Sequence, residues 1–66
     1  MRLIVNGEPL DLPATTTVAD LVVRRAPTQR RVAVARNGEV VPRSGWDSAL
    51  LAEGDRVEVL VAVAGG

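Results

Sequence analysis

Alternating apolar and polar positions predict five short strands in this chain. They are residues 2–6, 8–12, 31–36, 39–41 and 56–63. The dipeptide Asn6-Gly7 separates the first two strands, and Asn37-Gly38 separates the next two. Asn-Gly favours a two-residue hairpin turn, because both residues tolerate the positive φ that such a turn requires. The sequence therefore predicts two β-hairpins followed by one further strand.

Between the hairpins, the apolar residues are spaced by three and four positions, which is typical of a helix. They are Val18, Leu21 and Val22. Thr17 is the best candidate for the N-cap, because its hydroxyl can accept a backbone N–H and Asp20 follows three residues later. Pro27 is expected to stop the helix. After the second hairpin, residues 43–53 are irregular, with one short helical turn expected near residues 48–52.

The order β-β-α-β-β-turn-β predicts an α+β fold in which one helix covers one sheet, since each element has one apolar face to bury. The first and last strands are the most apolar, so we expect them to lie side by side in the middle of the sheet. This is the β-grasp (ubiquitin-like) architecture, a five-stranded mixed sheet covered by one α-helix. We expect a single domain over residues 1–66, with a flexible C-terminal tail at residues 64–66.

The composition excludes several kinds of chemistry. Without cysteine or histidine, the chain offers no disulfide, no thiolate metal site and no imidazole base. Eight arginines balance eight acidic residues, so the positive footprint of a nucleic-acid-binding protein is missing. Trp46 is the only aromatic residue, and we expect it to close one end of the core rather than to anchor a partner. The apolar runs are too short for a signal peptide or a membrane span, so we expect a cytoplasmic protein.

Motifs for catalysis are also missing: there is no glycine-rich phosphate loop, no pair of histidines and no serine beside a base. We therefore expect a monomer that binds no cofactor or metal and is not itself an enzyme. The remaining candidate for chemistry is the C-terminal pair. Without a Cβ, Gly65 lets the backbone enter a narrow channel, and Gly66 presents the carboxylate carbon.

Several short motifs cover nearly the whole chain. They are Asn6-Gly7-Glu8, TVADL at residues 17–21, VAVARNGEVVPRS at residues 32–44, Trp46, GDRVE at residues 54–58 and AVAGG at residues 62–66. In this order, the motifs resemble the ThiS family of bacterial sulfur carrier proteins in thiamine biosynthesis.

The resemblance implies a reaction at Gly66. A partner enzyme would use ATP and magnesium to adenylate its C-terminal carboxylate, and sulfur would then replace AMP to give a thiocarboxylate. The resemblance also implies three partners: a ThiF-type adenylyltransferase, a cysteine desulfurase or other sulfur donor, and a ThiG-type thiazole synthase that takes the sulfur.

The predicted partner surface is the sheet face opposite the helix. If the strand alternation holds, Ile4, Leu60 and Ala62 point away from the helix and form an exposed apolar patch, a feature that often marks an interface. Arg43 and Arg56 are candidates for charges at the rim that steer a partner. The alternative is an ordinary surface, on which scattered apolar residues and solvated charges need no partner.

Three other functions are compatible with the same pattern. Sulfur carriers of molybdopterin or cysteine synthesis share the β-grasp and the Gly-Gly end, although they lack the VPRSGW run of residues 41–46. A ubiquitin-like protein modifier would form an isopeptide bond through Gly66. A pure interaction module would have a tail without chemistry.

Overall fold

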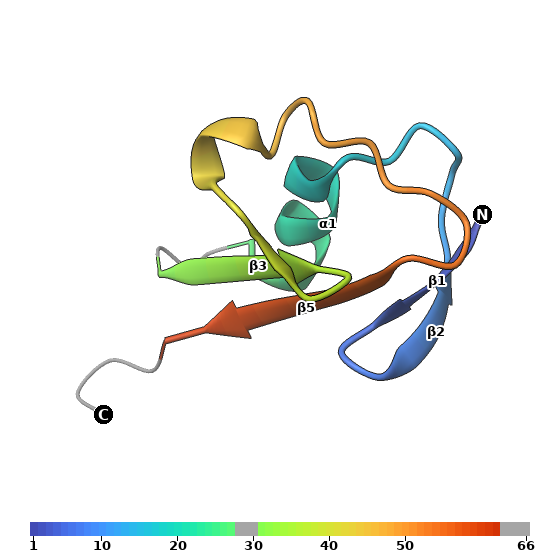
Figure 1. Ribbon diagram of the computed structural model, residues 1–66, viewed down its shortest axis with the longest axis horizontal. Coiled ribbons are helices and arrows are strands. Elements are labelled where there is room, and N and C mark those ends of the chain that lie inside the picture. The colour runs from blue at the N-terminus through green and yellow to red at the C-terminus, as the bar shows by residue number, and fades with distance from the viewer. Residues whose placement is uncertain (28–30, 63–66) are drawn as a thin grey trace.

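The computed structural model describes residues 1–27 and 31–62, in which five strands form one mixed sheet and one α-helix packs on one face (Figure 1). The elements in chain order are β1 (Arg2–Val5), β2 (Glu8–Asp11), α1 (Val18–Arg25), β3 (Val32–Arg36), β4 (Glu39–Val41), the 3-10 helix η1 (Arg43–Gly45) and β5 (Arg56–Val61). The predicted α+β class and the order of the strands are confirmed.

The sheet order is β2-β1-β5-β3-β4, so the last strand of the chain lies in the centre. Strands β1 and β5 run parallel, with Ile4 opposite Arg56 and Val5 opposite Val57. The other neighbours are antiparallel. The predicted adjacency of the first and last strands is confirmed. Their central position places the alternate side chains of Leu3, Val5, Val57 and Val59 in the core on the helix side of the sheet.

Both predicted hairpin turns are present, and their backbones have nearly the same conformation. Asn6 and Asn37 each have a φ of 51°, and the glycines that follow have φ values of 82° and 84°. Two successive positive φ values define the turn that best matches the twist of antiparallel strands. The two Asn-Gly dipeptides therefore fix where β1 and β3 end.

Helix α1 begins at a complete capping box. The Thr17 hydroxyl accepts a hydrogen bond from the Asp20 N–H at 3.2 Å, and the Asp20 carboxylate accepts one from the Thr17 N–H at 3.0 Å. These two bonds satisfy backbone donors that a helix start leaves without partners. The helix ends at Arg25, two residues before Pro27, as the sequence predicts.

The core lies between α1 and the sheet. Its fully buried side chains are Leu3, Val5, Val18, Leu21, Val34 and Val57. Trp46 closes this core at the side of β4: its side chain is buried, and its indole N–H donates to the Val41 carbonyl at 2.9 Å. The prediction of a core role for Trp46 is confirmed.

The prediction of a helical turn near residues 48–52 is wrong, because the structure places a helical turn earlier, at η1. Residues 49–51 instead run extended beside the start of α1. The Ala49 carbonyl accepts from the Val18 N–H at 2.9 Å, and the Leu51 N–H donates to the Thr16 carbonyl at 3.0 Å. These tertiary bonds occupy the backbone groups that a local helix would need.

The last strand is also shorter than expected, since β5 ends at Val61. Val61 shares the alternation of the buried Val57 and Val59, yet its side chain is 38% exposed. Val63, the last residue of the predicted strand, lies outside the described residues. Within the described part of the chain, neither helix combines the length and the apolar content needed to cross a membrane.

Candidate functional site

The strand that leads to the C-terminal glycines is held from both sides. On one side, β5 pairs with β3 from Val57 to Val61, and the Ala62 N–H donates to the Arg31 carbonyl at 3.0 Å. On the other side, β1 pairs with its first half, where the Asn6 N–H donates to the Val57 carbonyl at 2.9 Å. Gly65 and Gly66, the predicted reactive end, lie outside the described residues.

Two asparagine side chains complete the attachment of β5. The Asn6 amide bonds to both backbone groups of Val59: Oδ1 accepts from the N–H at 2.8 Å, and Nδ2 donates to the carbonyl at 3.3 Å. At the opposite end of the strand, Asn37 Oδ1 accepts from the Arg56 N–H at 3.0 Å. The sequence interpretation missed these contacts, because it assigned Asn-Gly to the turns alone.

A buried carboxylate anchors the start of β5. Asp55 accepts hydrogen bonds from the Asn37 amide at 3.0 Å, from the Ala52 N–H at 2.8 Å and from Arg36 Nε at 2.8 Å. Burial of Asp55 raises the pKa of its carboxyl, but these hydrogen bonds and the charge of Arg36 outweigh burial. The pKa of Asp55 therefore lies below its usual value, and the side chain is ionised at neutral pH.

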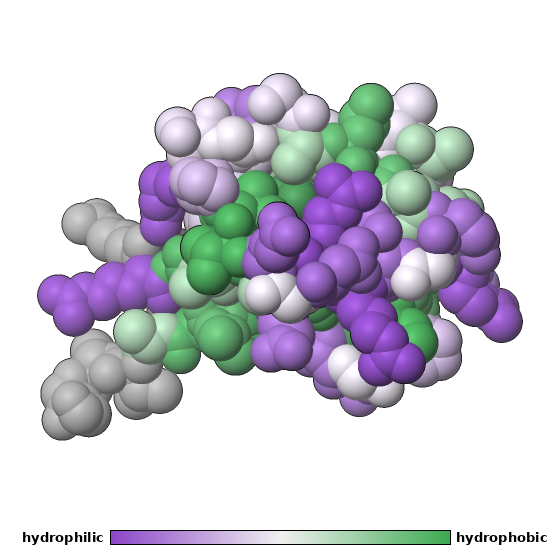
Figure 2. Space-filling model, in the orientation of Figure 1, coloured by the Kyte–Doolittle hydropathy of each residue, from purple (hydrophilic) through white to green (hydrophobic). Residues whose placement is uncertain are grey.

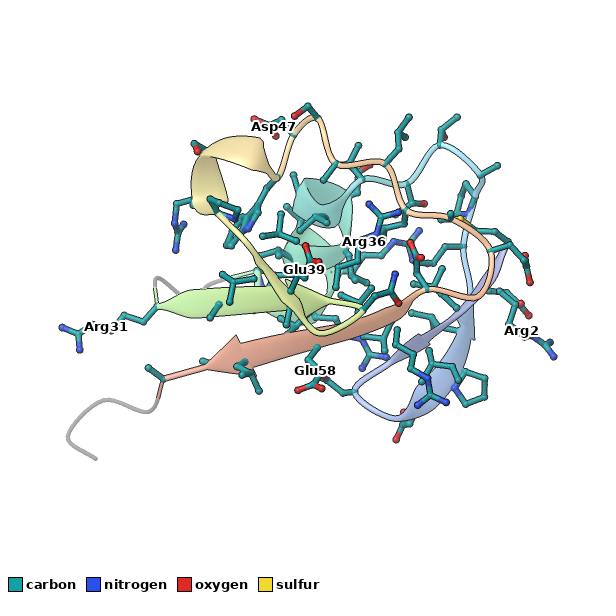
Figure 3. The ribbon with its side chains drawn as sticks, in the orientation of Figure 1. Arg2, Arg31, Arg36, Glu39, Asp47 and Glu58 are labelled. Carbon is teal, nitrogen blue, oxygen red and sulfur yellow. The ribbon has the colours of Figure 1, made fainter. Side chains whose placement is uncertain are left out.

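The face of the sheet opposite α1 carries most of the predicted partner residues. Ile4, Arg56 and Leu60 line one shallow hollow of about 460 Å³, and Glu58 of the same hollow points away from α1 (Figure 3). A second hollow of about 380 Å³ joins Leu60 to Ala62. Leu60 is therefore the residue that the two hollows share, and its side chain is 56% exposed.

Arg43 lies apart from this face. It belongs to η1, which lies on the same side of the sheet as α1 (Figure 1). Its guanidinium stacks on the Trp46 ring, with Cζ 4.6 Å from the ring centroid. The structure thus brings Ile4, Arg56, Leu60 and Ala62 together along the central strands and leaves Arg43 near the end of the core.

Further apolar side chains extend the surface around Leu60. Ala33, directly opposite Leu60 on β3, is exposed and lines the second hollow. Val40 on β4 is 76% exposed. Figure 2 shows hydrophobic side chains gathered toward the end of β5, next to the more polar middle of the molecule. The sequence interpretation missed Ala33 and Val40, although the alternation of their strands could have found them. We call Ile4, Ala33, Val40, Leu60 and Ala62 the open-face patch.

The described residues offer little for chemistry within the chain itself. Across residues 1–27 and 31–62, no group of three or more acidic side chains is placed to hold a metal ion. The two hollows on the open face are shallow. The second is lined mainly by apolar side chains, whereas Asn6, Arg56 and Glu58 add polar groups to the first. This arrangement suits contact with another macromolecule better than the enclosure of a small substrate.

A mixed sheet with parallel first and last strands, covered by one helix, defines a β-grasp protein of the ubiquitin-like class. A crystal structure of the thiamine biosynthesis protein ThiS from Geobacter metallireducens matches this fold with a TM-score of 0.82 and 33% identity, over all of both chains. A solution structure of a thiamine biosynthesis protein from the same organism matches with a TM-score of 0.81 and 36% identity, over all of this chain and 88% of that one.

The family model named ThiS family matches residues 3–66, and the chain belongs to this family. It is 29% identical to the sulfur carrier protein ThiS of Escherichia coli over the full length of both chains. It is also 36% identical to the thiazole synthases of Paramagnetospirillum magneticum and Magnetococcus marinus, but it spans only 20% of their length.

Proposed function

We propose that this protein is a sulfur carrier for thiazole formation in thiamine biosynthesis, and that the Gly66 carboxylate is the group that carries the sulfur. One observation carries the proposal: the family match runs through the two glycines to residue 66, and the alignment with the E. coli sulfur carrier covers both chains completely. In this role, the chain is a substrate of partner enzymes rather than an enzyme.

The proposed reaction has two steps. First, the Gly66 carboxylate attacks the α-phosphate of ATP, bound with magnesium by the partner, and releases pyrophosphate. The resulting acyl adenylate is a good electrophile, because AMP is a better leaving group than an oxide ion. Second, sulfide attacks the carbonyl carbon, and AMP leaves with one of the carboxylate oxygens. Where the donor is instead a persulfide, its attack gives an acyl disulfide, and a thiol then attacks the donor's sulfur, forms a disulfide with the donor and releases the thiocarboxylate. The product is a thiocarboxylate at Gly66, whose sulfur is a good nucleophile.

The proposal includes three partners. A ThiF-type adenylyltransferase would supply the ATP site, and a cysteine desulfurase or another donor would supply sulfur. Thiazole synthase would accept the sulfur, and two thiazole synthases support this choice because a fifth of each resembles the present chain. A reaction that consumes ATP and needs these enzymes would take place in the cytoplasm.

The open-face patch is the surface that we propose for the adenylyltransferase. Leu60 is its centre, because it joins the two hollows and lies on the strand that leads to the tail. Arg56 and Glu58 precede Leu60 on the same strand and would adjust the orientation of the partner by their charges. Arg43 stacks on Trp46 on the other side of the sheet, so a contact of Arg43 with the same partner would require a second surface.

The test is a measurement of intact mass. The purified 66-residue chain is mixed with ATP, magnesium, a ThiF-type adenylyltransferase and a sulfur donor. The expected result is a gain that matches the exchange of one oxygen for sulfur. Removal of Gly66, or addition of one alanine after it, should abolish the gain, since either change moves the reactive carboxylate.

An unchanged mass of the 66-residue chain with an enzyme that modifies a known ThiS protein would contradict the proposal. If the chain gained sulfur but transferred it to the enzymes of molybdopterin or cysteine synthesis and not to thiazole synthase, the carrier would belong to another pathway. A covalent adduct with another protein through Gly66 would instead indicate a protein modifier.

A further inference from the structure

The turn after β1 removes the backbone partners that Val59 would otherwise have. Parallel strands exchange evenly spaced hydrogen bonds, and β1 and β5 do so as far as Val57. The next bonds of the ladder would require the chain to stay extended at Asn6 and Gly7. The positive φ of both residues turns the backbone toward β2 instead.

The side-chain amide of Asn6 replaces the missing backbone. It presents an acceptor and a donor, as a peptide group does, and it bonds to the N–H of Val59 at 2.8 Å and to its carbonyl at 3.3 Å. Loss of the amide would remove both of these protein partners from the Val59 backbone, at a part-buried position beside the first hollow. Asn6 thus extends the β1 side of the ladder from Val57 to Val59, toward the tail.

These contacts with Val59 are also the last that β5 receives from the β1 side, within the described part of the chain. Beyond Val59, the strand is held from the β3 side only, through the pairing of Leu60 and Val61 and the bond from Ala62 to Arg31. The last hydrogen bonds on the β1 side of β5 are therefore made by the side chain of Asn6 and not by the backbone of β1.

We propose that Asn6 is a positioning residue for the reaction at Gly66. By holding Val59 from the β1 side, it fixes the direction in which residues 60–62 leave the centre of the sheet, so that an adenylating partner has less of the chain to order when it binds. Ordering the backbone of one additional residue costs about a tenfold factor in binding. This inference rests on the function proposed above.

The chain contains a matched control in its second Asn-Gly turn. Asn37 has the same φ as Asn6, and its side chain also bonds to the backbone of β5. Its contact is with Arg56, at the far end of the strand from the tail. The variants Asn6→Gly and Asn37→Gly both keep a residue that tolerates positive φ and both remove one amide. They differ in the end of β5 that they release, and Asn37→Gly also removes the hydrogen bond from Asn37 to Asp55.

The first measurement is amide hydrogen exchange of the two variants, which needs no partner. In Asn6→Gly, the amide of Val59 should exchange about tenfold faster or more. The amide of Leu21 in the core serves as a reference, because its exchange rate should change only by the loss of global stability. In Asn37→Gly, the acceleration should fall on Arg56. Unchanged exchange at Val59 in Asn6→Gly would overturn the inference, whatever the function of the tail.

The second measurement is the rate of adenylation, with the carrier as the varied substrate. Asn6→Gly should raise KM about tenfold and leave kcat within about twofold, because the cost falls on binding of the tail and not on the chemical step. Asn37→Gly should leave both within about twofold. Equal effects of the two variants, or a fall in kcat at constant KM, would overturn the positioning role.

A second variant keeps the test sharp if Asn6→Gly fails to fold. Asn6→Asp retains the acceptor for the Val59 N–H and loses the donor to its carbonyl, so it should shift KM and the Val59 exchange rate in the same directions. Failure of the wild-type chain to gain sulfur would refute the proposed function, whereas a sulfur-loaded wild type with an equally active Asn6→Asp would refute the positioning role alone.

Discussion

Nη2 of Arg36 lies 2.7 Å from Oδ2 of Asp55, and this ion pair joins the end of β3 to the residue that precedes β5. Both side chains are largely shielded from solvent, with 29% and 10% of their side-chain surface exposed. Asp55 also accepts bonds from Ala52 and Asn37, so one carboxylate connects the loop before β5 with the turn after β3.

The change Asp55→Asn should therefore reduce the free energy of unfolding by about 2 kcal/mol, because hydrogen bonds to a charged acceptor are lost and Arg36 keeps an uncompensated charge. Urea unfolding, followed by Trp46 fluorescence, measures this difference. Asp47→Asn is the matched control, since Asp47 is exposed, and it should change the free energy by about 0.5 kcal/mol at most. Equal effects of both changes would contradict the structural role of Asp55.

Stability should depend on pH through the same carboxylate. The pKa of Asp55 in the folded protein is lowered, so its contribution is complete above the pKa of the unfolded state, about 3.9, and is lost as the pH falls through the lower folded value. The difference in free energy of unfolding between wild type and Asp55→Asn should be constant near neutral pH and shrink below about pH 4. Asp11, whose pKa is also lowered by Arg2, is common to both proteins and cancels. A difference that grows on acidification would have the wrong sign.

Leu60→Asp should block adenylation while the fold is retained. A charge at the shared edge of the two hollows would have to be desolvated in the complex, and central contacts of this kind change binding by about thirtyfold or more. Leu50→Asp is the matched control, because Leu50 has the same exposure of 56% but pairs with Thr17 at the start of α1. Pyrophosphate exchange with the adenylyltransferase separates the variants, and normal exchange by Leu60→Asp would refute the proposed surface.

Thr17→Ala should destabilise the protein by about 1 kcal/mol, because the first turn of α1 loses its capping side chain. Thermal unfolding measures the loss. The neighbouring Thr15 is exposed and lies outside the capping box, so Thr15→Ala should change stability by about 0.5 kcal/mol at most. If the two alanine variants had the same melting temperature, the capping box would not contribute to stability.

The sequence predicts the architecture well where one local rule decides the outcome. The Asn-Gly turns, the Thr17 cap and the alternation of valines define the hairpins, the helix and the last strand without knowledge of the rest of the chain. Residues 43–53 follow no such rule: their conformation depends on Trp46 entering the core and on residues 49–51 bonding to residues 16–18. The helical turn was misplaced for that reason.

Prediction of the site had a similar limit. Strand alternation places Leu60 and Ala62 on the face opposite α1, because every second side chain of a strand points to the same face of the sheet. It also assigns Val61 to the core, but the 38% exposure of Val61 shows that the core does not extend over this end of the sheet. The bonds of Asn6 and Asn37 to β5 depend on the register between strands that are distant in sequence, and no local pattern reveals that register.

The parallel pairing of β1 and β5 gives the molecule a polarity that an experimenter can use. Since β1 starts where β5 starts, the amino terminus and the end of β5 lie at opposite ends of the sheet (Figure 1). The Met1 amine donates to the Leu12 carbonyl at 2.7 Å, and the amide N–H of a peptide extension could still make that bond. A dye, an affinity handle or a surface tether attached at Met1 would thus sit on the far side from Ala62, and it would leave the end of β5 accessible to any enzyme that approaches it.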